Sequence, residues 1–148
     1  MTTLPLAMHF EADRTVFFDD AREVVSLAVS PRILAARHWP RSLPGPLQLE
    51  RAIDDVESAI EQAGLAHADR GVLLATDSVQ HLLPDLLEHG TLCSRDDMED
   101  AFTRWVGLSY IVGRGGAGLA LYGQSAAALL LLREVMHHLG FSAIRMQA

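Results

Sequence analysis

The sequence predicts an α+β domain, in which a small sheet has helices packed mainly on one face. Three observations predict it: a strand-like hairpin pattern over residues 6–18, a strongly amphipathic helix after Pro46, and the order strand, helix, strand over residues 118–146. The length of 148 residues, with 49% hydrophobic and 21% charged residues, suits one folded unit. We therefore expect residues 1–148 to form a single globular α+β domain, with a mostly α-helical fold as the alternative.

The N-terminal segment predicts a β-hairpin followed by a helix. Leu6–Phe10 and Thr15–Phe18 are apolar enough for strands, and the polar residues Glu11–Arg14 lie between them. The residues Asp20–Glu23 resemble a capping box with aspartate in the serine position. Apolar residues follow at helical spacing, so we expect a helix over Ala21–Val29.

Two prolines mark the starts of the next helices. Ser30 followed by Pro31 has the residue types of a helix N-terminus and predicts a short helix through Arg37. Pro46 begins the clearest helix of the chain, in which apolar residues recur on one stripe and acidic residues occupy the remaining face. Gly64 supplies its stop.

The middle of the chain is less regular. Val72–Ala75 is a short apolar run that fits a buried strand or a helix start, and the pattern leaves both open. Val79–Glu88 contains Pro84, so a helix here either begins near Pro84 or is kinked there. Ser94–Asp97 resembles a capping box and predicts a helix that ends near Gly113.

The C-terminal segment predicts a β-α-β unit. Gly118–Tyr122 is expected to be a strand, Gly123–Ser125 a turn, Ala126–Leu139 a helix, and Phe141–Met146 a second, parallel strand. The helix is apolar on every side over Ala126–Leu132, which requires cover from a sheet plus another helix or another subunit. We therefore expect a homo-oligomer formed through the C-terminal third.

The net charge of −7 is concentrated in the middle of the chain. Residues 50–100 contain thirteen acidic residues and three arginines, whereas residues 101–148 contain one acidic residue and four arginines. An acidic chain is a poor candidate for binding nucleic acid, so we expect none. The chain has no lysine and no asparagine, as expected for a GC-rich bacterial genome. This excludes a P-loop lysine and a Schiff-base lysine, and we expect no cofactor.

Cysteine use and hydropathy predict a cytoplasmic location. Cys93 is the only cysteine, which fits a reducing compartment, and the first twenty residues lack the pattern of a signal peptide. The uncharged stretch Gly115–Leu132 is close to the minimum length of a membrane span. Because it contains four glycines and a glutamine, two short buried elements explain it better, and we expect no membrane association.

A candidate anion site lies at the predicted start of the C-terminal helix. The glycine cluster Gly113–Gly118 precedes a predicted strand instead of following one, so it does not match a dinucleotide-binding loop. Free N–H groups at a helix start attract anions, and an arginine folded back over that start would add a positive charge. The predicted ligand-binding residues are Arg114, Gly115, Gly116, Gln124 and Ser125.

Other chemical motifs are weaker. No two of the seven histidines show the four-residue spacing that places two ligands on one helix face, and there is no cysteine pair, so we expect no metal site. Convergence of His9 or His38 with an acidic residue from elsewhere stays open. Adjacent carboxylates such as Asp54–Asp55 diverge by about 100° on a helix and do not suit acid/base work on one bond. The catalytic residues, if any, stay unidentified.

Two functional hypotheses follow. The leading one is a non-catalytic bacterial accessory or interaction module that forms homo-oligomers and has a protein partner, because the motifs show no catalytic constellation. The alternative is a small enzyme or sensor that binds a phosphate- or carboxylate-bearing metabolite near Arg114 and the helix start at Ser125.

Overall fold

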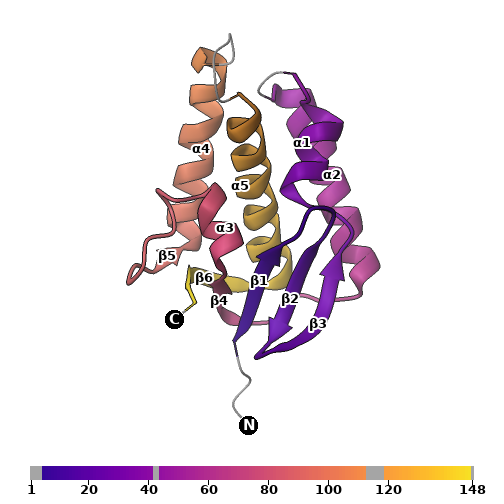
Figure 1. Cartoon of the computed structure of the whole chain (residues 1–148), viewed down its shortest axis with the longest axis vertical. Coiled ribbons are helices and arrows are strands. Elements are labelled where there is room, and N and C mark those ends of the chain that lie inside the picture. Colours follow the sequence, from indigo (N-terminus) through magenta and orange to yellow (C-terminus); the bar gives the residue numbers. More distant parts are fainter. Residues whose placement is uncertain (1–4, 42–43, 113–118, 148) are drawn as a thin grey trace.

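The computed structural model describes the backbone of residues 5–41, 44–112 and 119–147, and their side chains except at 106–112 and 119–122. It confirms the α+β class, with a mixed six-stranded sheet in the order β3-β2-β1-β4-β6-β5 (Figure 1). In chain order the described elements are β1 (Leu6–Phe10), β2 (Thr15–Asp19), β3 (Arg22–Leu27), α1 (Pro31–His38), α2 (Pro46–Ala63), β4 (Gly71–Ala75), α3 (Asp77–Leu82), β5 (Cys93–Ser94), α4 (Arg95–Val112), α5 (Leu119–Leu139) and β6 (Phe141–Met146).

The N-terminal hairpin is present, and a third strand extends it. β1 pairs antiparallel with β2, with Met8 opposite Phe17. The helix predicted over Ala21–Val29 is wrong: Arg22–Leu27 forms β3, antiparallel to β2. Asp20 adopts a left-handed conformation with φ of 59°, which reverses the chain between the two strands. The valines of this segment suit a strand, and pairing with β2 outweighs the helical spacing.

α1 and α2 begin and end where their prolines and glycine predict. The Ser30 hydroxyl accepts a hydrogen bond of 3.1 Å from the backbone N–H of Ile33, so Ser30 caps α1. Gly64 ends α2 with φ of 77°, a conformation that favours glycine. The same residue types that mark a helix start or stop in the sequence therefore fulfil that role in the fold.

The structure decides how the Val72–Ala75 run and the segment around Pro84 fold. Val72–Ala75 belongs to β4, so the run is a strand, parallel to β1 on one side and to β6 on the other. Neither interpretation of Pro84 is right, because α3 ends at Leu82 and Pro84 lies in the loop beyond it. Proline disfavours the helical conformation in the preceding residue, which explains why the helix stops there.

The β-α-β unit predicted at the C-terminus is wrong in its first half. α5 already includes Leu119–Tyr122 and continues through Gly123–Ser125, so the predicted strand and turn are helical, with Gly118 outside the described residues. Phe141–Met146 does form the expected parallel strand, but its partner is β4. The crossover between these two strands contains α3, β5, α4 and α5.

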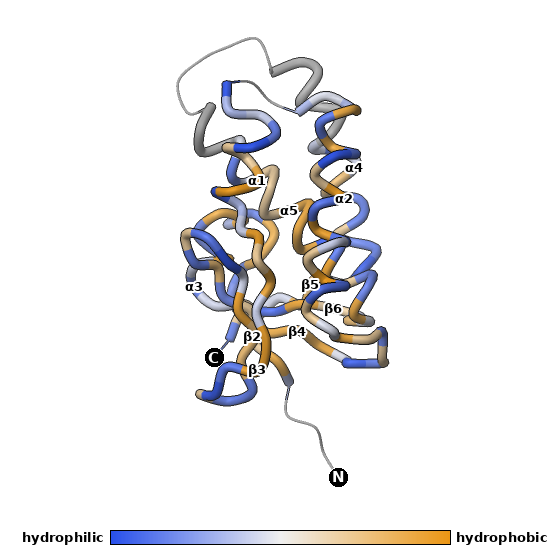
Figure 2. Tube along the Cα trace, turned by 90° about the vertical axis from the view of Figure 1, so that its right-hand side faces the viewer, coloured by the Kyte–Doolittle hydropathy of each residue, from blue (hydrophilic) through white to orange (hydrophobic). Residues whose placement is uncertain are grey.

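α5 is the central helix of the core. Every residue from Ala126 to Leu132 is at most 4% exposed. α5 contacts α1, α2, α3 and α4 as well as β6, and it runs between α4 and α1 in Figure 1. Figure 2 colours much of α5 and β4 as hydrophobic. The chain's own elements therefore cover the apolar helix, and its burial does not require a second subunit. Among the described residues, no helix is long and apolar enough to cross a membrane.

The helices pack mainly against one face of the sheet. Met8 and Phe10 of β1 and Phe17 of β2 belong to the same buried cluster as the leucines of α5. β1 and β4 are adjacent and parallel, so both carboxyl ends lie at the same edge. The backbone N–H of Thr76, just after β4, donates to the carbonyl of Met8 at 3.2 Å and fixes the two ends together. This edge carries the polar groups described next.

Candidate functional site

A compact polar cluster lies where β1 and β4 end. His9 Nδ1 is 2.9 Å from the Thr76 hydroxyl oxygen and 3.0 Å from the Ser78 hydroxyl oxygen. The two hydroxyl oxygens are 2.9 Å apart. All three side chains are only partly buried, and they come from β1 and from the start of α3. In open sheets with parallel strands, ligands bind beyond the carboxyl ends of the strands.

The Ser78 hydroxyl contacts three polar groups, the backbone N–H of Phe10, His9 Nδ1 and the Thr76 hydroxyl. Its oxygen already accepts a hydrogen bond of 2.9 Å from the backbone N–H of Phe10. Its hydroxyl proton can be donated to His9 Nδ1, to Thr76 or to a ligand. When His9 carries its proton on Nε2, Nδ1 accepts from the hydroxyl of Thr76 or of Ser78, and a hydrogen bond from Ser78 is the arrangement that polarises a serine hydroxyl.

A cavity of about 260 Å³ opens beside this cluster. It lies between the turn after β1, the start of α1, α3 and the first part of α5. Polar groups on its wall come from four separate segments of the chain. The lining residues are Phe10, Glu11, Ala12, Pro31, Arg32, Ser78, His81, Leu82 and Gln124.

The positive charge of this cavity comes from Arg32. Its Nε donates to the carbonyl of Ala12 at 3.1 Å, and the Ser30 hydroxyl donates to the same carbonyl at 2.7 Å. These bonds fix the turn after β1 against the start of α1. The carboxylate of Glu11 forms an ion pair with Arg14, which also pairs with Glu23. Glu11 therefore has a partner of its own, and the exposed Arg32 is the guanidinium that lines the cavity.

A second, more apolar cavity of about 540 Å³ adjoins the first, because His81 and Leu82 line both. It lies between the loop after α3 and the helices α4 and α5. Its polar groups include Arg104 and Ser125, whereas Trp105 contributes an aromatic surface. A ligand with an anionic group in the first cavity would have room for an apolar portion in the second.

The sequence-predicted site residues are only partly brought together. Gln124 lines the first cavity and Ser125 the second. Both lie inside α5, which begins at Leu119, so the expectation of a helix start with free N–H groups at Ser125 is wrong. Arg114, Gly115 and Gly116 lie outside the described residues. Ligand binding at the five residues together stays a prediction.

Sequence reasoning missed the residues that form this edge of the sheet. The available signal was Thr76–Asp77–Ser78, which directly follows the buried run of β4 and places two hydroxyls at a helix start. The convergence left open for His38 does occur, since its Nε2 is 2.6 Å from Asp55 Oδ2. Burial raises the pKa of Asp55, but hydrogen bonds from Arg37 and His38 outweigh it and hold this pKa below its ordinary value. This contact joins α1 to α2.

A third cavity, of about 600 Å³, is a poorer candidate for an anion. Its wall includes Asp85, Asp97 and Asp100, which repel negative charge, and the thiol of Cys93. Burial, together with the charge of Asp97, raises the pKa of Cys93 to about 11. The thiol is therefore protonated at neutral pH and unsuited to nucleophilic attack.

Comparison with known proteins identifies the fold. No family model matches this sequence, and no curated protein matches it. Similar solved structures include an Aquifex aeolicus Ppx/GppA phosphatase (TM-score 0.71, 10% identity, 99% of this chain and 54% of that one). An exopolyphosphatase-like protein is also similar (TM-score 0.66, 12% identity, 97% of this chain and 56% of that one). So is an exopolyphosphatase from Cytophaga hutchinsonii (TM-score 0.65, 11% identity, 98% of this chain and 53% of that one). The chain spans about half the length of these proteins, and the likeness is one of fold.

Proposed function

We propose that this chain binds a phosphate-bearing anionic metabolite in the cavity between the carboxyl ends of β1 and β4 and the start of α1. The observation that carries the proposal is the convergence of Arg32, Ser78, His81 and Gln124 on one cavity of about 260 Å³. These side chains supply a permanent cation, a hydroxyl, an imidazole and an amide. Phosphate oxygens accept hydrogen bonds from all four groups.

The guanidinium of Arg32 is held in a geometry that suits an anion. Its Nε is already used by the carbonyl of Ala12, which orients the planar group. Its terminal nitrogens make no hydrogen bond to any residue in the described part of the chain. Arg32 also lies in the first turn of α1, where the helix dipole attracts negative charge. Planar recognition of phosphate by arginine requires such free, oriented donors.

The structural neighbours support a phosphate-bearing ligand over a non-catalytic interaction module. Two of them are a phosphatase and an exopolyphosphatase, which are enzymes that act on phosphate compounds, and a third is an exopolyphosphatase-like protein. The position of the cavity, beyond the carboxyl ends of adjacent parallel strands, is where open sheets bind ligands. Both considerations favour the alternative hypothesis from the sequence, with the ligand moved to Arg32.

Isothermal titration with inorganic phosphate, pyrophosphate and tripolyphosphate tests the proposal. We expect saturable binding of at least one of them to the wild-type chain, and at least tenfold weaker binding by Arg32→Gln. Arg51→Gln is the matched control, because it removes the same charge from an exposed position on α2. Equal weakening in both variants, or no binding by the wild type, would contradict the proposal.

A homo-oligomer formed through the C-terminal third stays a prediction. The apolar stretch Ala126–Leu132 of α5 is covered within the chain, so a contact between copies would use other surfaces. Light scattering over a range of concentrations tests it, and a monomer at every concentration would contradict it. The cytoplasmic location and a protein partner stay predictions as well.

A further inference from the structure

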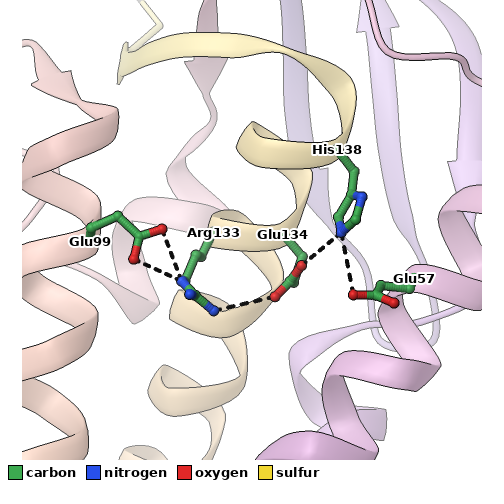
Figure 3. A network of polar contacts seen from close by, with 5 residues as sticks. All are labelled: Glu57, Glu99, Arg133, Glu134 and His138. Carbon is green, nitrogen blue, oxygen red and sulfur yellow. Dashed lines mark hydrogen bonds and ion pairs between the residues drawn. The ribbon is translucent and has the colours of Figure 1, made fainter.

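A group of three metal-ligating side chains lies between α2 and α5. Glu57 comes from α2, whereas Glu134 and His138 lie one turn apart on α5. One ligand atom from each residue can be chosen so that all three lie within 4.8 Å of one another. Figure 3 shows both carboxylates directed at the same edge of the imidazole.

The two separations between the imidazole nitrogen and the carboxylates match those between ligands of one metal ion. His138 Nε2 is 3.0 Å from Glu134 Oε2 and 3.4 Å from Glu57 Oε1. Bonds of 2.0–2.1 Å at tetrahedral angles place neighbouring ligand atoms roughly 3.3 Å apart. The three side chains therefore need only small movements to surround a single ion.

The imidazole of His138 does not supply enough positive charge for the two carboxylates beside it. Both carboxylates approach the same nitrogen, Nε2, which carries at most one proton and cannot donate two well-aligned hydrogen bonds. The side chain of Glu134 is 7% exposed, so its charge is shielded from water. A buried carboxylate requires a compensating cation or a proton.

The nearby arginine does not remove this deficit. Arg133 Nε is 3.1 and 3.0 Å from the two carboxylate oxygens of Glu99 on α4. Its contact with Glu134 is longer, at 3.4 Å, and its guanidinium also stacks on the ring of Phe102. Most of the guanidinium is therefore directed toward α4, on the far side of Glu134 from His138 (Figure 3).

We propose that Glu57, Glu134 and His138 form a binding site for a divalent transition-metal ion, with Zn²⁺ as the best match. Two carboxylates neutralise a divalent ion, and an imidazole nitrogen selects Zn²⁺ over Mg²⁺. The Glu57 and His138 side chains are 46% and 35% exposed, so an ion can enter from solvent. Three protein ligands leave a fourth position for water. The bound ion would crosslink α2 to α5.

The spacing of a glutamate and a histidine indicates this site, whereas the spacing between histidines does not. Glu134 and His138 are four residues apart, the separation that places two ligands on one helix face. The expectation that no metal site exists rested on pairs of histidines and on cysteines. The third ligand comes from another helix, and only the packing of α2 against α5 brings it close.

Isothermal titration of untagged, chelator-treated protein with ZnCl₂ alone tests this site. We expect one saturable site, a melting temperature that rises with Zn²⁺ concentration, and no comparable response to MgCl₂. Glu57→Gln and His138→Gln should each weaken binding at least tenfold. Circular dichroism of the metal-free variants checks that they fold, and both positions are accessible enough to tolerate the change.

Two neighbouring residues provide matched controls. Glu61→Gln lies one turn after Glu57 on the exposed face of α2, and His137→Gln removes the exposed imidazole next to His138. Both should leave Zn²⁺ affinity within about twofold. The absence of saturable Zn²⁺ binding, or affinity that is unchanged in Glu57→Gln and His138→Gln, would show that the cluster is an ion-pair network only and would overturn the proposal.

Discussion

The indole Nε1 of Trp39 donates a hydrogen bond of 2.9 Å to the backbone carbonyl of Gly123, 84 residues further along the chain. The contact joins the end of α1 to α5, and Trp39 is only 3% exposed. A Cβ at position 123 would lie 3.3 Å from the indole ring, so glycine permits this close approach. A glycine inside a helix lowers the stability of the helix by about 1 kcal/mol relative to alanine. At position 123 the glycine leaves room for the contact with Trp39.

Trp39→Phe should lower the free energy of unfolding by about 1–3 kcal/mol, because it removes the buried donor and leaves a small void. Urea denaturation followed by circular dichroism measures the change. An unchanged midpoint and slope would show that the indole contact contributes little to the packing of α1 on α5.

Gly140→Ala should be severely destabilising. Gly140 has φ of 87°, and a Cβ there would lie 1.8 Å from the carbonyl oxygen of Ala68. Gly90→Ala is the matched control, since its φ is 83° and nothing lies within 4 Å of the added carbon. We expect a loss of about 1–2 kcal/mol for Gly90→Ala from the left-handed backbone alone, and a clearly larger loss for Gly140→Ala. Similar thermal unfolding temperatures for the two variants would contradict the packing around Gly140.

Cys93 should react slowly with iodoacetamide in the native protein. Its pKa is raised to about 11 by burial. A thiol with this pKa is about 0.1% ionised at pH 8, against about a quarter for an ordinary thiol with a pKa near 8.5. We expect labelling at least 100-fold slower in native than in urea-denatured protein, measured by mass spectrometry. Comparable rates would mean that the thiol is accessible and ionised in the folded state.

Asp55→Asn should lower the free energy of unfolding at neutral pH but not in acid. The folded-state pKa of Asp55 is lowered, so its charged form contributes stability above the unfolded pKa of about 3.9. That contribution is lost as the pH falls through the folded pKa. About a third of the side chain is exposed, so we expect a difference below about 1 kcal/mol at pH 7.

The pH series for Asp55→Asn is measured by urea denaturation from pH 7 to pH 3. Asp54→Asn is the control, since it removes a neighbouring carboxylate from an exposed position on the same helix. The difference between wild type and Asp55→Asn should shrink toward pH 3. A difference that stays constant over this range would show that the ionised carboxylate is not the source of the stability.

Local residue chemistry was enough to predict those elements whose signals lie within a few residues. Ser30–Pro31 and Pro46–Gly64 marked α1 and α2 at the ends that the structure has. The capping residues of α4 behave as expected: the Ser94 N–H donates to Asp97 Oδ2 at 3.0 Å, and the Asp97 N–H donates to the Ser94 hydroxyl at 3.1 Å. These hydrogen bonds form within one turn, so they depend little on the rest of the fold.

The predictions from sequence are wrong where contacts between distant segments outweigh local residue patterns. β3 has apolar residues at helical spacing, but its backbone pairs with β2. Gly123 predicts a turn, but it lies inside α5, where its carbonyl accepts a hydrogen bond from Trp39. The candidate anion cavity likewise joins residues from four segments, and the sequence indicated only Gln124 among them.

The α+β class, the hairpin, the capped helices and the acidic face of α2 could be predicted, because each depends on residue type and spacing over short distances. The three-dimensional fold was needed to show that Ala126–Leu132 is buried within its own chain, that His9 contacts Thr76 and Ser78, and that Glu57 lies beside Glu134 and His138. The physical reason is that packing joins side chains from distant segments. The free energy of that packing belongs to the whole core and cannot be assigned to any one stretch of sequence.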